Sequence, residues 1–390
     1  MSMRVLVLGA RAPAALEWVR GLAGQGVSVY AADSLALPFT RFSRYLKEYF
    51  RLPEPRHQPE EWIDALVQLA IKHNIDWIIP TCEEVFYLAW GASRFQGICR
   101  LFTSDFDLLH RLHHKGEFAQ LVQRWSLQAP TTQTVKTIEE LASFSDQTSR
   151  YVFKPAYSRF ATSTLISPTP EALKLLKPTA EQPWVVQERI RGEEFCSYSL
   201  LREGQLLAHS VYQPRHRVGQ GSGIYFEQVE ITAIEPFVRS FGQLSGYTGQ
   251  LAFDWMCDQQ QNFWVLECNP RATSGIHLFD DQPEALLGAL APVLREDQPV
   301  FYPSHQPRMV ALAMLMFAGR KLLQKNFWKD FSRAEDVICR KGDAMPLLAQ
   351  LPGMMEISMR ALMRGCSLLA ASTADIEWDG QPLGSKLQRL

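Results

Sequence analysis

Residues 263–275, FWVLECNPRATSG, join an apolar strand pattern to three polar side chains on alternate positions, Glu267, Asn269 and Arg271. Side chains two residues apart in a strand point to the same face of a sheet. These three side chains are therefore expected to share one face at the end of the strand. Such a row of polar groups beside an apolar strand indicates either a ligand site or a solvent-exposed edge.

The preceding segment, GQLAFDWMCDQQQN, carries a second strand pattern. If the residues between the two patterns form a hairpin loop, Asp258 pairs with Phe263, and Asp254 lies directly opposite Glu267. One face of this hairpin is then apolar and carries Leu251, Phe253, Trp255, Trp264 and Leu266. The other face carries the two acids together with Asn269, and we interpret it as a site.

Two carboxylates that lie about 5 Å apart across a sheet repel each other, and both stay ionised only where a positive charge compensates them. Two carboxylates and an amide oxygen are hard donors that suit Mg²⁺, which fills the rest of its octahedron with phosphate oxygens and water. We therefore predict that Asp254, Glu267 and Asn269 bind magnesium and that Arg271 binds a phosphate. A salt-bridged surface hairpin is the alternative that the pattern leaves open.

Composition limits the class of protein. The chain has 390 residues, of which 46% are hydrophobic and 21% charged, as in a globular protein of two or three domains. A formal net charge of −1 gives no sequence-wide attraction for nucleic acid or an anionic membrane, so local groups must meet any charged ligand. Seven cysteines without a C-x-x-C pair favour reduced thiols and a cytoplasmic protein. No apolar run is long enough for a transmembrane segment.

The first part of the chain, residues 1–108, alternates strand and helix patterns, which predicts a doubly wound α/β domain. Asp33 follows the second strand pattern, where a dinucleotide-binding domain has its ribose-binding acid. The turn GARAPAA, however, has one glycine where such a domain has three, which argues against a nicotinamide enzyme. Glu83 and Glu84 follow the buried strand pattern DWIIP, at the edge where open α/β sheets bind ligands, although acids in loops are usually only solvated.

Two further regions follow. Residues 109–300 carry many strand patterns and few helices, which predicts an α+β domain with an antiparallel sheet. Residues 301–390 are expected to form a mainly helical C-terminal extension. Apolar residues near helical spacing in it are Leu348, Leu351, Met355, Leu362, Cys366 and Leu369. We interpret them as core packing or a dimer face, with a substrate cover or a membrane-surface contact as alternatives.

Basic residues and one acidic turn complete the candidate site. Lys154 ends the strand pattern YVFK, and Lys115 stands at a helix start in RLHHKGEFAQL. Such cations can bind the phosphate oxygens that magnesium leaves free, although a lysine after a strand is usually only solvated. The strand pattern WVVQERI is followed by RGEEF, where Gln187 and Glu188 can meet the edge of a base and Glu194 a ribose.

Together these residues resemble the ATP-grasp superfamily, specifically its carboxylate–amine ligase branch, over roughly residues 1–290. The hairpin acids with E-C-N-P-R are similar to the family's metal-binding signature. The resemblance implies a small α/β domain in front of an ATP-grasp domain, in which two α+β subdomains hold ATP between them. It implies ATP contacts from Lys115, Lys154, Gln187, Glu188, Ile190 and Glu194. The loop after Lys154 lacks the glycines of the family's phosphate lid, and its candidate phosphate-binding hydroxyls are Ser158, Thr162, Ser163 and Thr164.

The resemblance implies an ATP-dependent ligase that joins a carboxylate to an amine through an acyl phosphate and releases ADP and phosphate. The candidate catalytic residues are Lys154, Arg215, Arg217 and Arg271. Arg215 and Arg217 stand next to Gly219, Gly221 and Gly223 in a segment that resembles a mobile loop, and we expect one of them to bind the substrate carboxylate. A plain hairpin with exposed arginines is the alternative.

The expected ligands are ATP with one or two Mg²⁺ ions, for which Mn²⁺ can substitute, and a small carboxylate and amine such as amino acids. A homodimer is a candidate assembly, and nucleic acid is not an expected partner. Two other functions stay open. One is a different ATP-grasp reaction, either carboxylation or phosphotransfer to a small molecule. The other is a non-catalytic nucleotide-binding module, against which the intact acids and lysines argue.

Overall fold

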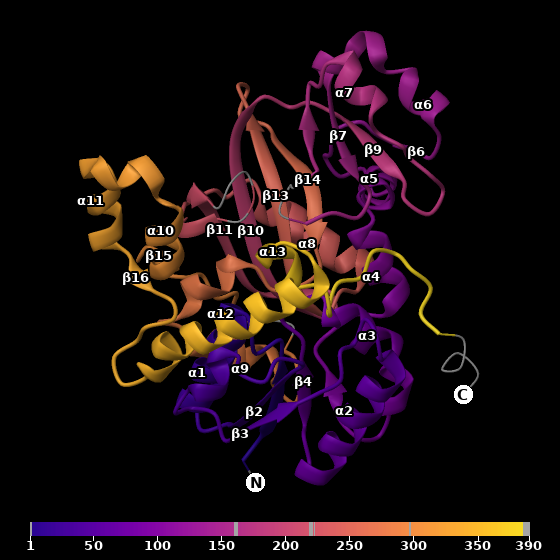
Figure 1. Ribbon diagram of the computed structural model, residues 1–390. Helices are drawn as coiled ribbons and strands as arrows, with labels where there is room; N and C mark the ends of the chain where they lie inside the picture. Colours follow the sequence, from indigo (N-terminus) through magenta and orange to yellow (C-terminus); the bar gives the residue numbers. More distant parts are fainter. Residues whose placement is uncertain (1, 160–162, 218–220, 222, 296–297, 385–390) are drawn as a thin grey trace.

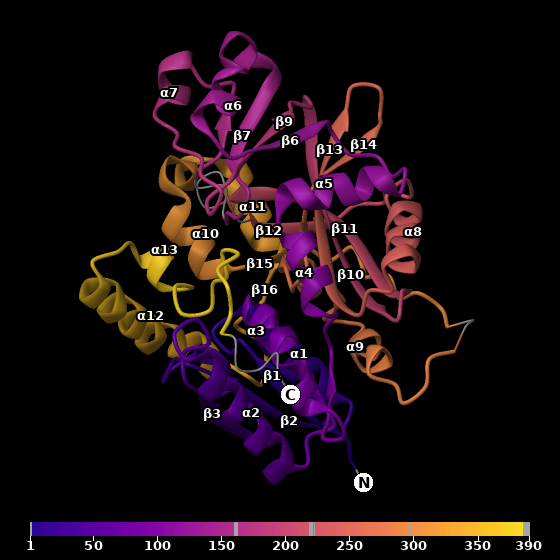
Figure 2. The same ribbon diagram turned by 90° about the vertical axis from the view of Figure 1, so that its right-hand side faces the viewer.

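The structure is a computed structural model that describes residues 2–159, 163–217, 221, 223–295 and 298–384. Figures 1 and 2 show an N-terminal α/β unit, a large central sheet, a small sheet with two helices at the opposite end, and C-terminal helices along one side. The mixed α/β architecture predicted from the sequence is confirmed. Among the described helices, none is long and apolar enough to cross a bilayer.

The N-terminal unit is a parallel sheet with helices on both faces. Its strand order is β3-β2-β1-β4-β5. The strands are β1 (Arg4–Leu8), β2 (Ser28–Asp33), β3 (Glu48–Arg51), β4 (Trp77–Ile79) and β5 (Arg100–Leu101). The helices are α1 (Pro13–Gly24), α2 (Pro59–His73) and α3 (Glu84–Trp90), with short turns η1 (Phe39–Phe42) and η2 (Ala92–Phe95). Because β1 alternates its side chains, Val5 and Val7 pack with α1 on one face, while Leu6 and Leu8 pack with α2 on the other.

The small sheet has the order β6-β9-β7-β8. Its strands are β6 (Thr132–Val135), β7 (Tyr151–Pro155), β8 (Leu165–Ile166) and β9 (Trp184–Glu188), and α6 (Ile138–Ala142), η3 (Ser145–Arg150) and α7 (Pro170–Lys174) cover it. A separate cluster of buried side chains, Val135, Leu141, Phe153, Leu173 and Val186, forms its core. The small sheet therefore packs around its own core.

The central sheet has the order β14-β13-β10-β11-β12-β15-β16. Its strands are β10 (Gly192–Arg202), β11 (Gln205–Arg217), β12 (Gly223–Gln228), β13 (Gly249–Asp258), β14 (Phe263–Asn269), β15 (Arg308–Met309) and β16 (Glu335–Asp336). The elements around it are α4 (Phe106–His113), α5 (Lys115–Arg124), α8 (Glu235–Ser245), η4 (Ser274–Phe279) and α9 (Pro283–Ala289). β10 to β14 pair antiparallel, as the sequence predicts.

The C-terminal part contains helices, as expected, but β15 and β16 also extend the central sheet. Its helical elements are α10 (Ala311–Phe317), η5 (Gly319–Leu323), α11 (Lys325–Arg333), α12 (Met345–Arg364) and α13 (Leu368–Ala371). The interpretation of the apolar face of α12 as core packing is wrong within this chain, because Leu348, Leu351, Met355 and Leu362 are exposed. α12 instead packs on η1, and its buried residues include Ala349, Gly353 and Ala361.

The chain after α13 returns to the N-terminal unit and is fixed there by a buried ionic network. The Arg11 guanidinium lies between Asp33 and Asp375, with Nη2 2.5 Å from Asp33 Oδ1 and Nη1 2.6 Å from Asp375 Oδ1. Arg360 of α12 adds a second cation, 3.3 Å from Asp375. Asp33 therefore binds Arg11, as part of the contact that holds the C-terminal segment in place.

Asp375→Asn tests this contact. Burial alone raises the pKa of the Asp375 carboxyl, but the hydrogen bond and charge of Arg11 outweigh burial and lower this pKa to about 2. A lowered carboxyl pKa stabilises the fold above about pH 4, by about 2 kcal/mol, and this contribution is lost as the pH falls from about 4 to about 2. Asp375→Asn should therefore lower the free energy of unfolding in urea at pH 7, and its difference from the wild type should shrink below pH 4.

The matched control is Asp64→Asn, because the exposed Asp64–Arg94 pair should change stability by less than about 1 kcal/mol. A destabilisation by Asp375→Asn that stays constant from pH 7 to pH 2 would contradict the assignment.

Candidate active site

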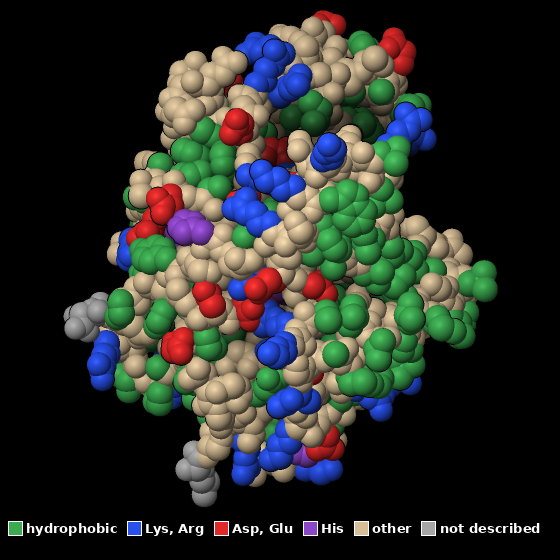
Figure 3. Space-filling view, turned by 90° about the vertical axis from the view of Figure 1, so that its left-hand side faces the viewer, with side chains coloured by type: hydrophobic (Ala, Val, Ile, Leu, Met, Phe, Trp, Pro, Cys, Tyr) green, Lys and Arg blue, Asp and Glu red, His purple; other side chains and the backbone are tan. Residues whose placement is uncertain are grey.

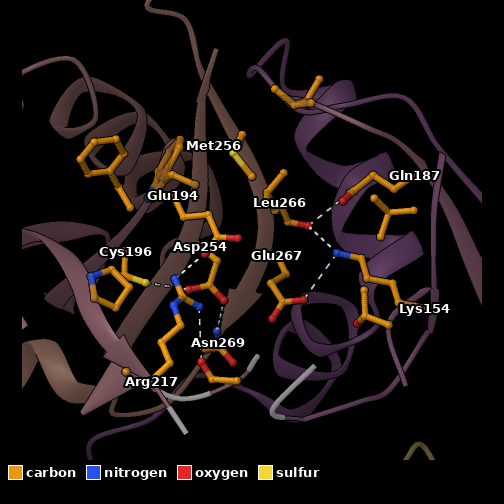
Figure 4. A pocket seen from close by; sticks show the side chains of 18 of the residues that line it. Lys154, Gln187, Glu194, Cys196, Arg217, Asp254, Met256, Leu266, Glu267 and Asn269 are labelled. Atoms are coloured by element: carbon orange, nitrogen blue, oxygen red, sulfur yellow. Dashed lines mark hydrogen bonds and ion pairs between the residues drawn. The ribbon is translucent and has the colours of Figure 1, made fainter. Parts of the chain in front are cut away.

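A cavity of about 870 Å³ lies between the small sheet and the central sheet (Figure 4). β7 and β9 supply one wall, and β10, β11, β13 and β14 supply the other. Most of the residues predicted from the sequence line it: Lys154, Gln187, Glu188, Ile190, Glu194, Arg217, Asp254, Glu267, Asn269 and Arg271. The structure therefore gathers residues that are far apart in the sequence into one cleft.

Asp254 and Glu267 lie directly opposite each other on β13 and β14, as predicted. The expected pairing nearer the turn is wrong, because Phe263 pairs with Cys257 and not with Asp258. A β-bulge next to Asp254 absorbs the difference of one residue and restores the expected register at the acids. Counting residues back from the turn predicts neither the one-residue shift at Phe263 nor the bulge that compensates it.

Because of the bulge, the buried face of β14 differs from the predicted apolar face. Trp264 and Leu266 were expected in the core, but Val265 and Cys268 are the buried residues of β14. Leu266 lines the cavity, and its carbonyl oxygen accepts hydrogen bonds from Lys154 Nζ at 3.5 Å and from Gln187 Nε2 at 3.2 Å (Figure 4). The bulge thus gives the central sheet a backbone acceptor for two side chains of the small sheet.

The two lysines meet at Glu267. Lys115 is the first residue of α5, and Lys154 lies in β7; their ammonium groups are 3.5 Å and 3.6 Å from Glu267 Oε2. Lys115 also donates to the carbonyl oxygen of Ser158 at 3.1 Å. Both lysine side chains are 7% exposed, so water screens their charges little. Two buried positive charges therefore converge on one acid.

The two acids have opposite electrostatic environments. Burial alone raises the pKa of Glu267, but the charges of Lys115 and Lys154 outweigh burial and lower this pKa to about 2. Burial, followed by the Glu267 charge, raises the pKa of Asp254 to about 7. Burial lowers the pKa of Lys154, and the Glu267 charge opposes that shift. The lysines thus compensate Glu267, while the Asp254 charge lacks comparable compensation.

This donor set fits Mg²⁺. The Asp254 carboxylate accepts from Cys196 Sγ at 3.2 Å and from Asn269 Nδ2 at 3.4 Å, and a divalent cation would offset its uncompensated charge. Across the described parts of the chain, no group of three or more His, Cys, Asp or Glu side chains is arranged to hold a metal. An open site with two carboxylates and one amide suits a cation that also binds phosphate and water.

The residues predicted to meet the base and ribose line the same cavity. Gln187 is buried and donates to Thr132 Oγ1 at 3.1 Å as well as to Leu266, whereas Glu188 is exposed. Glu194 forms an ion pair with Arg217. Gly192 is needed for close approach, because a Cβ there would lie 1.7 Å from the Cys257 carbonyl oxygen. Glu194, the candidate acid for the ribose, is thus paired with Arg217, a candidate for binding the substrate carboxylate.

Arg215 is not brought to this cavity. It pairs with Glu227 at 2.9 Å and lies 3.9 Å from Asp330. The pairing of β11 with β12 is irregular around residue 216, so Arg215 and Arg217 lie in different environments. The segment of Arg215 and Arg217 therefore includes hairpin strands, while Gly219 lies outside the described residues. The role predicted for Arg215 in substrate binding has no geometric support, and Arg217 is the better candidate.

Two charged residues at the edge of the cleft were not predicted as site residues. Arg159 lines the cavity, donates through Nε to Glu83 at 2.6 Å, and contacts Asp379 at 2.7 Å. Glu83 also lies 3.7 Å from Arg271. The position of Glu83 after β4 was a weak signal in the sequence, and the only signal for Arg159 was a lone arginine in the loop after Lys154.

The hydroxyls expected to bind phosphate are only partly placed. Ser158 and Thr164 line the cavity, Ser163 is exposed, and Thr162 lies outside the described residues. Their predicted role stays a prediction.

No model of a known protein family matches the sequence, and no curated protein matches it significantly. The fold, however, is similar to solved structures. N5-carboxyaminoimidazole synthetase from Staphylococcus aureus matches with a TM-score of 0.62 and 11% identity, covering 88% of this chain and 92% of that chain. Phosphoribosylamine–glycine ligase from Thermotoga maritima matches with a TM-score of 0.59 and 16% identity, covering 77% and 78%.

L-amino acid ligase from Bacillus licheniformis matches with a TM-score of 0.56 and 14% identity, covering 70% of this chain and 68% of that chain. These neighbours share the ATP-grasp fold. The chain therefore has the ATP-grasp fold that the resemblance implies.

Asp254→Asn tests the electrostatics of the acid pair. Because the folded-state pKa of Asp254 lies above its unfolded value, this residue destabilises the ligand-free protein progressively as the pH rises from about 4 to about 7. Asp254→Asn should raise the midpoint of thermal unfolding at pH 8 by at least about 2 °C, with a smaller gain at pH 5. The same variant should lose the stabilisation by ATP that depends on Mg²⁺.

Asp281→Asn, at an exposed position, is the control and should change neither quantity. An Asp254→Asn variant with an unchanged midpoint and full Mg²⁺-dependent stabilisation would refute the assignment.

Proposed function

We propose that the protein is an ATP- and Mg²⁺-dependent ligase that joins a small carboxylate to an amine. One observation carries the proposal: Asp254 and Glu267 lie opposite each other in a cleft between two sheets, with Lys115 and Lys154 converging on Glu267. Carboxylates for a metal and cations for phosphate oxygens then share one site. A surface hairpin held by salt bridges has no need of two buried lysines, one from α5 and one from the small sheet.

The chemistry explains why a nucleotide is required. A carboxylate oxygen is a poor leaving group, so an amine does not displace it at neutral pH. Transfer of the γ-phosphoryl group of ATP to the carboxylate forms an acyl phosphate and releases ADP. The amine then attacks the acyl carbon, phosphate leaves, and an amide forms. Exclusion of water from the cleft protects the acyl phosphate from hydrolysis.

The side chains of the cleft have separate roles in this proposal. Lys115, Lys154 and Arg271 neutralise charge on the phosphates as the phosphoryl group moves. Gln187, with Glu188 and Ile190, meets the base. Asp254, Glu267 and Asn269 would hold Mg²⁺, and the ion would supply positive charge against the phosphates of the nucleotide.

Glu194 and Arg217 act as a pair. Binding of a ribose hydroxyl by Glu194 would compete with its ion pair to Arg217 and free that guanidinium for the substrate carboxylate. Nucleotide binding would thereby prepare the carboxylate site.

The structural neighbours support this class of reaction without identifying the substrates. An L-amino acid ligase and a phosphoribosylamine–glycine ligase are among them, which favours amino acids as the carboxylate or amine. N5-carboxyaminoimidazole synthetase and biotin carboxylase are also among them, so carboxylation is the competing reaction.

A substrate screen separates these reactions. Release of ADP is measured with ATP and Mg²⁺ against amino acids, dipeptides and other carboxylates, each with and without a second amine. ADP release that needs both substrates, with an amide detected by mass, supports the ligase. ADP release that follows bicarbonate, or a single acceptor alone, would contradict it.

Glu267→Gln should abolish turnover, because the substitution removes a metal ligand and the acid on which both lysines converge. We expect a loss of at least about 100-fold in the rate of ADP release, with the far-ultraviolet circular dichroism spectrum unchanged. Glu193→Gln is the matched control, since Glu193 is an exposed acid of β10 outside the cavity lining. A Glu267→Gln enzyme that keeps most of its activity would rule out the site.

Arg217→Ala should raise the KM of the carboxylate substrate by about tenfold or more, with a much smaller change in the KM of ATP. Arg215→Ala is a matched control in the same strand, because Arg215 lies outside the cavity lining. Equal increases in both KM values for Arg217→Ala, or a larger effect of Arg215→Ala on the carboxylate, would contradict the placement.

A further inference from the structure

The C-terminal helices expose an unusual amount of apolar surface. Most of the large hydrophobic side chains that are exposed in the described part of the chain lie between residues 315 and 369. On α10, η5 and α11 they are Leu315, Met316, Phe317, Leu322, Leu323 and Trp328. On α12 and α13 they are Met345, Leu348, Leu351, Met355, Met359, Leu362, Met363, Leu368 and Leu369. We call these two sets together the apolar face.

Figure 3 shows hydrophobic side chains gathered in a broad band on this side of the molecule, where α10, α11 and α12 lie in Figure 1. Contiguous apolar surface of this kind usually marks a contact with another molecule or with lipid.

α12 is oriented opposite to the usual surface helix. A surface helix normally buries its large apolar side chains. α12 instead buries small residues, including Ala349, Gly353 and Ala361, and a Cβ at Gly353 would lie 3.0 Å from the carbonyl oxygen of Leu37 in the N-terminal unit. Most of its leucines and methionines are exposed, among them Leu362 at 84% and Met355 at 70%, while Leu347 and Met354 are half-buried. The packing of the chain itself therefore does not explain these side chains.

The charges around the apolar face are almost all positive. α10, η5 and α11 carry the exposed basic side chains Arg320, Lys321, Lys325 and Lys329, and their one acid, Asp330, lies 2.9 Å from His216 Nε2. On α12, the one acid is Glu356, which accepts from the backbone N–H groups of Ala36 and Leu37 and from Arg360. The acid of α12 is therefore engaged within the chain, while the cations of the face are exposed.

We propose that the apolar face binds the surface of a membrane that contains anionic lipid. Leucine, methionine, phenylalanine and tryptophan side chains would enter the boundary of the acyl chains, while the basic side chains would meet the headgroups. A second copy of this chain fits less well, because the contact would bring two sets of exposed basic side chains into one interface without exposed acids of the face to pair with them. The inference does not rest on the proposed ligase activity.

The test is co-sedimentation of the full chain with vesicles of phosphatidylcholine alone and with 30% phosphatidylglycerol, without ATP. Binding should require phosphatidylglycerol and weaken as salt rises. Leu351→Glu combined with Leu362→Glu should abolish binding. Replacing Lys321, Lys325 and Lys329 together by alanine should reduce partitioning about 100-fold, since each basic side chain near the surface contributes about 1 kcal/mol.

The matched control is Ile71→Glu combined with Leu175→Glu, which changes two exposed apolar residues outside the face and should leave binding unchanged. Thermal unfolding of each variant reports whether the fold is kept. Absence of vesicle binding by the wild-type chain would overturn the proposal. If vesicles do not bind and the wild-type chain forms a dimer that the Leu351→Glu, Leu362→Glu variant dissociates, the apolar face is a dimer interface and the proposal is wrong.

Discussion

The site depends on the electrostatic repulsion between two carboxylates that the central sheet places opposite each other. Glu267 is compensated by Lys115 and Lys154, which come from outside the central sheet. The same interaction therefore links α5 and the small sheet to the central sheet across the cleft. Asp254 lacks comparable compensation, which makes the ligand-free site ready for a cation. Stability is lowered at the position where a metal would bind, as is common at functional sites.

A second set of charges connects the cleft to the ends of the chain. Arg159 links the loop after β7 to Glu83 of the N-terminal unit and to Asp379 near the C-terminus. The indole of Trp378 is buried against Phe86. The backbone carbonyl oxygen of Trp378 accepts a hydrogen bond from Arg159 at 2.9 Å. The C-terminal segment thus contacts the edge of the cleft and the N-terminal sheet, so its position and that of the loop are coupled.

The sequence predicts much of the site because strand periodicity places side chains on faces. The alternation in residues 263–271 identified Glu267 and Asn269 as candidates, the assumed hairpin identified Asp254, and the strand pattern YVFK identified Lys154. The bulge beside Asp254 was not predictable, since periodicity cannot count an extra residue in one strand. Trp264 and Leu266 were assigned to the wrong face for that reason. The core-packing interpretation of the apolar residues of α12 was wrong, because helical spacing shows that a face is apolar and does not show what covers it. Arg159 was missed because its partners lie far away in the sequence.

In the proposed reaction, phosphorylation activates the carboxylate. This step is tested most directly with a carboxylate substrate labelled with ¹⁸O in both oxygens, incubated with ATP, Mg²⁺ and the amine that supports ADP release. An acyl phosphate carries one carboxylate oxygen to the phosphate, so each turnover should release inorganic phosphate that contains one ¹⁸O, as measured by mass spectrometry. Unlabelled phosphate formed together with the amide would contradict the account.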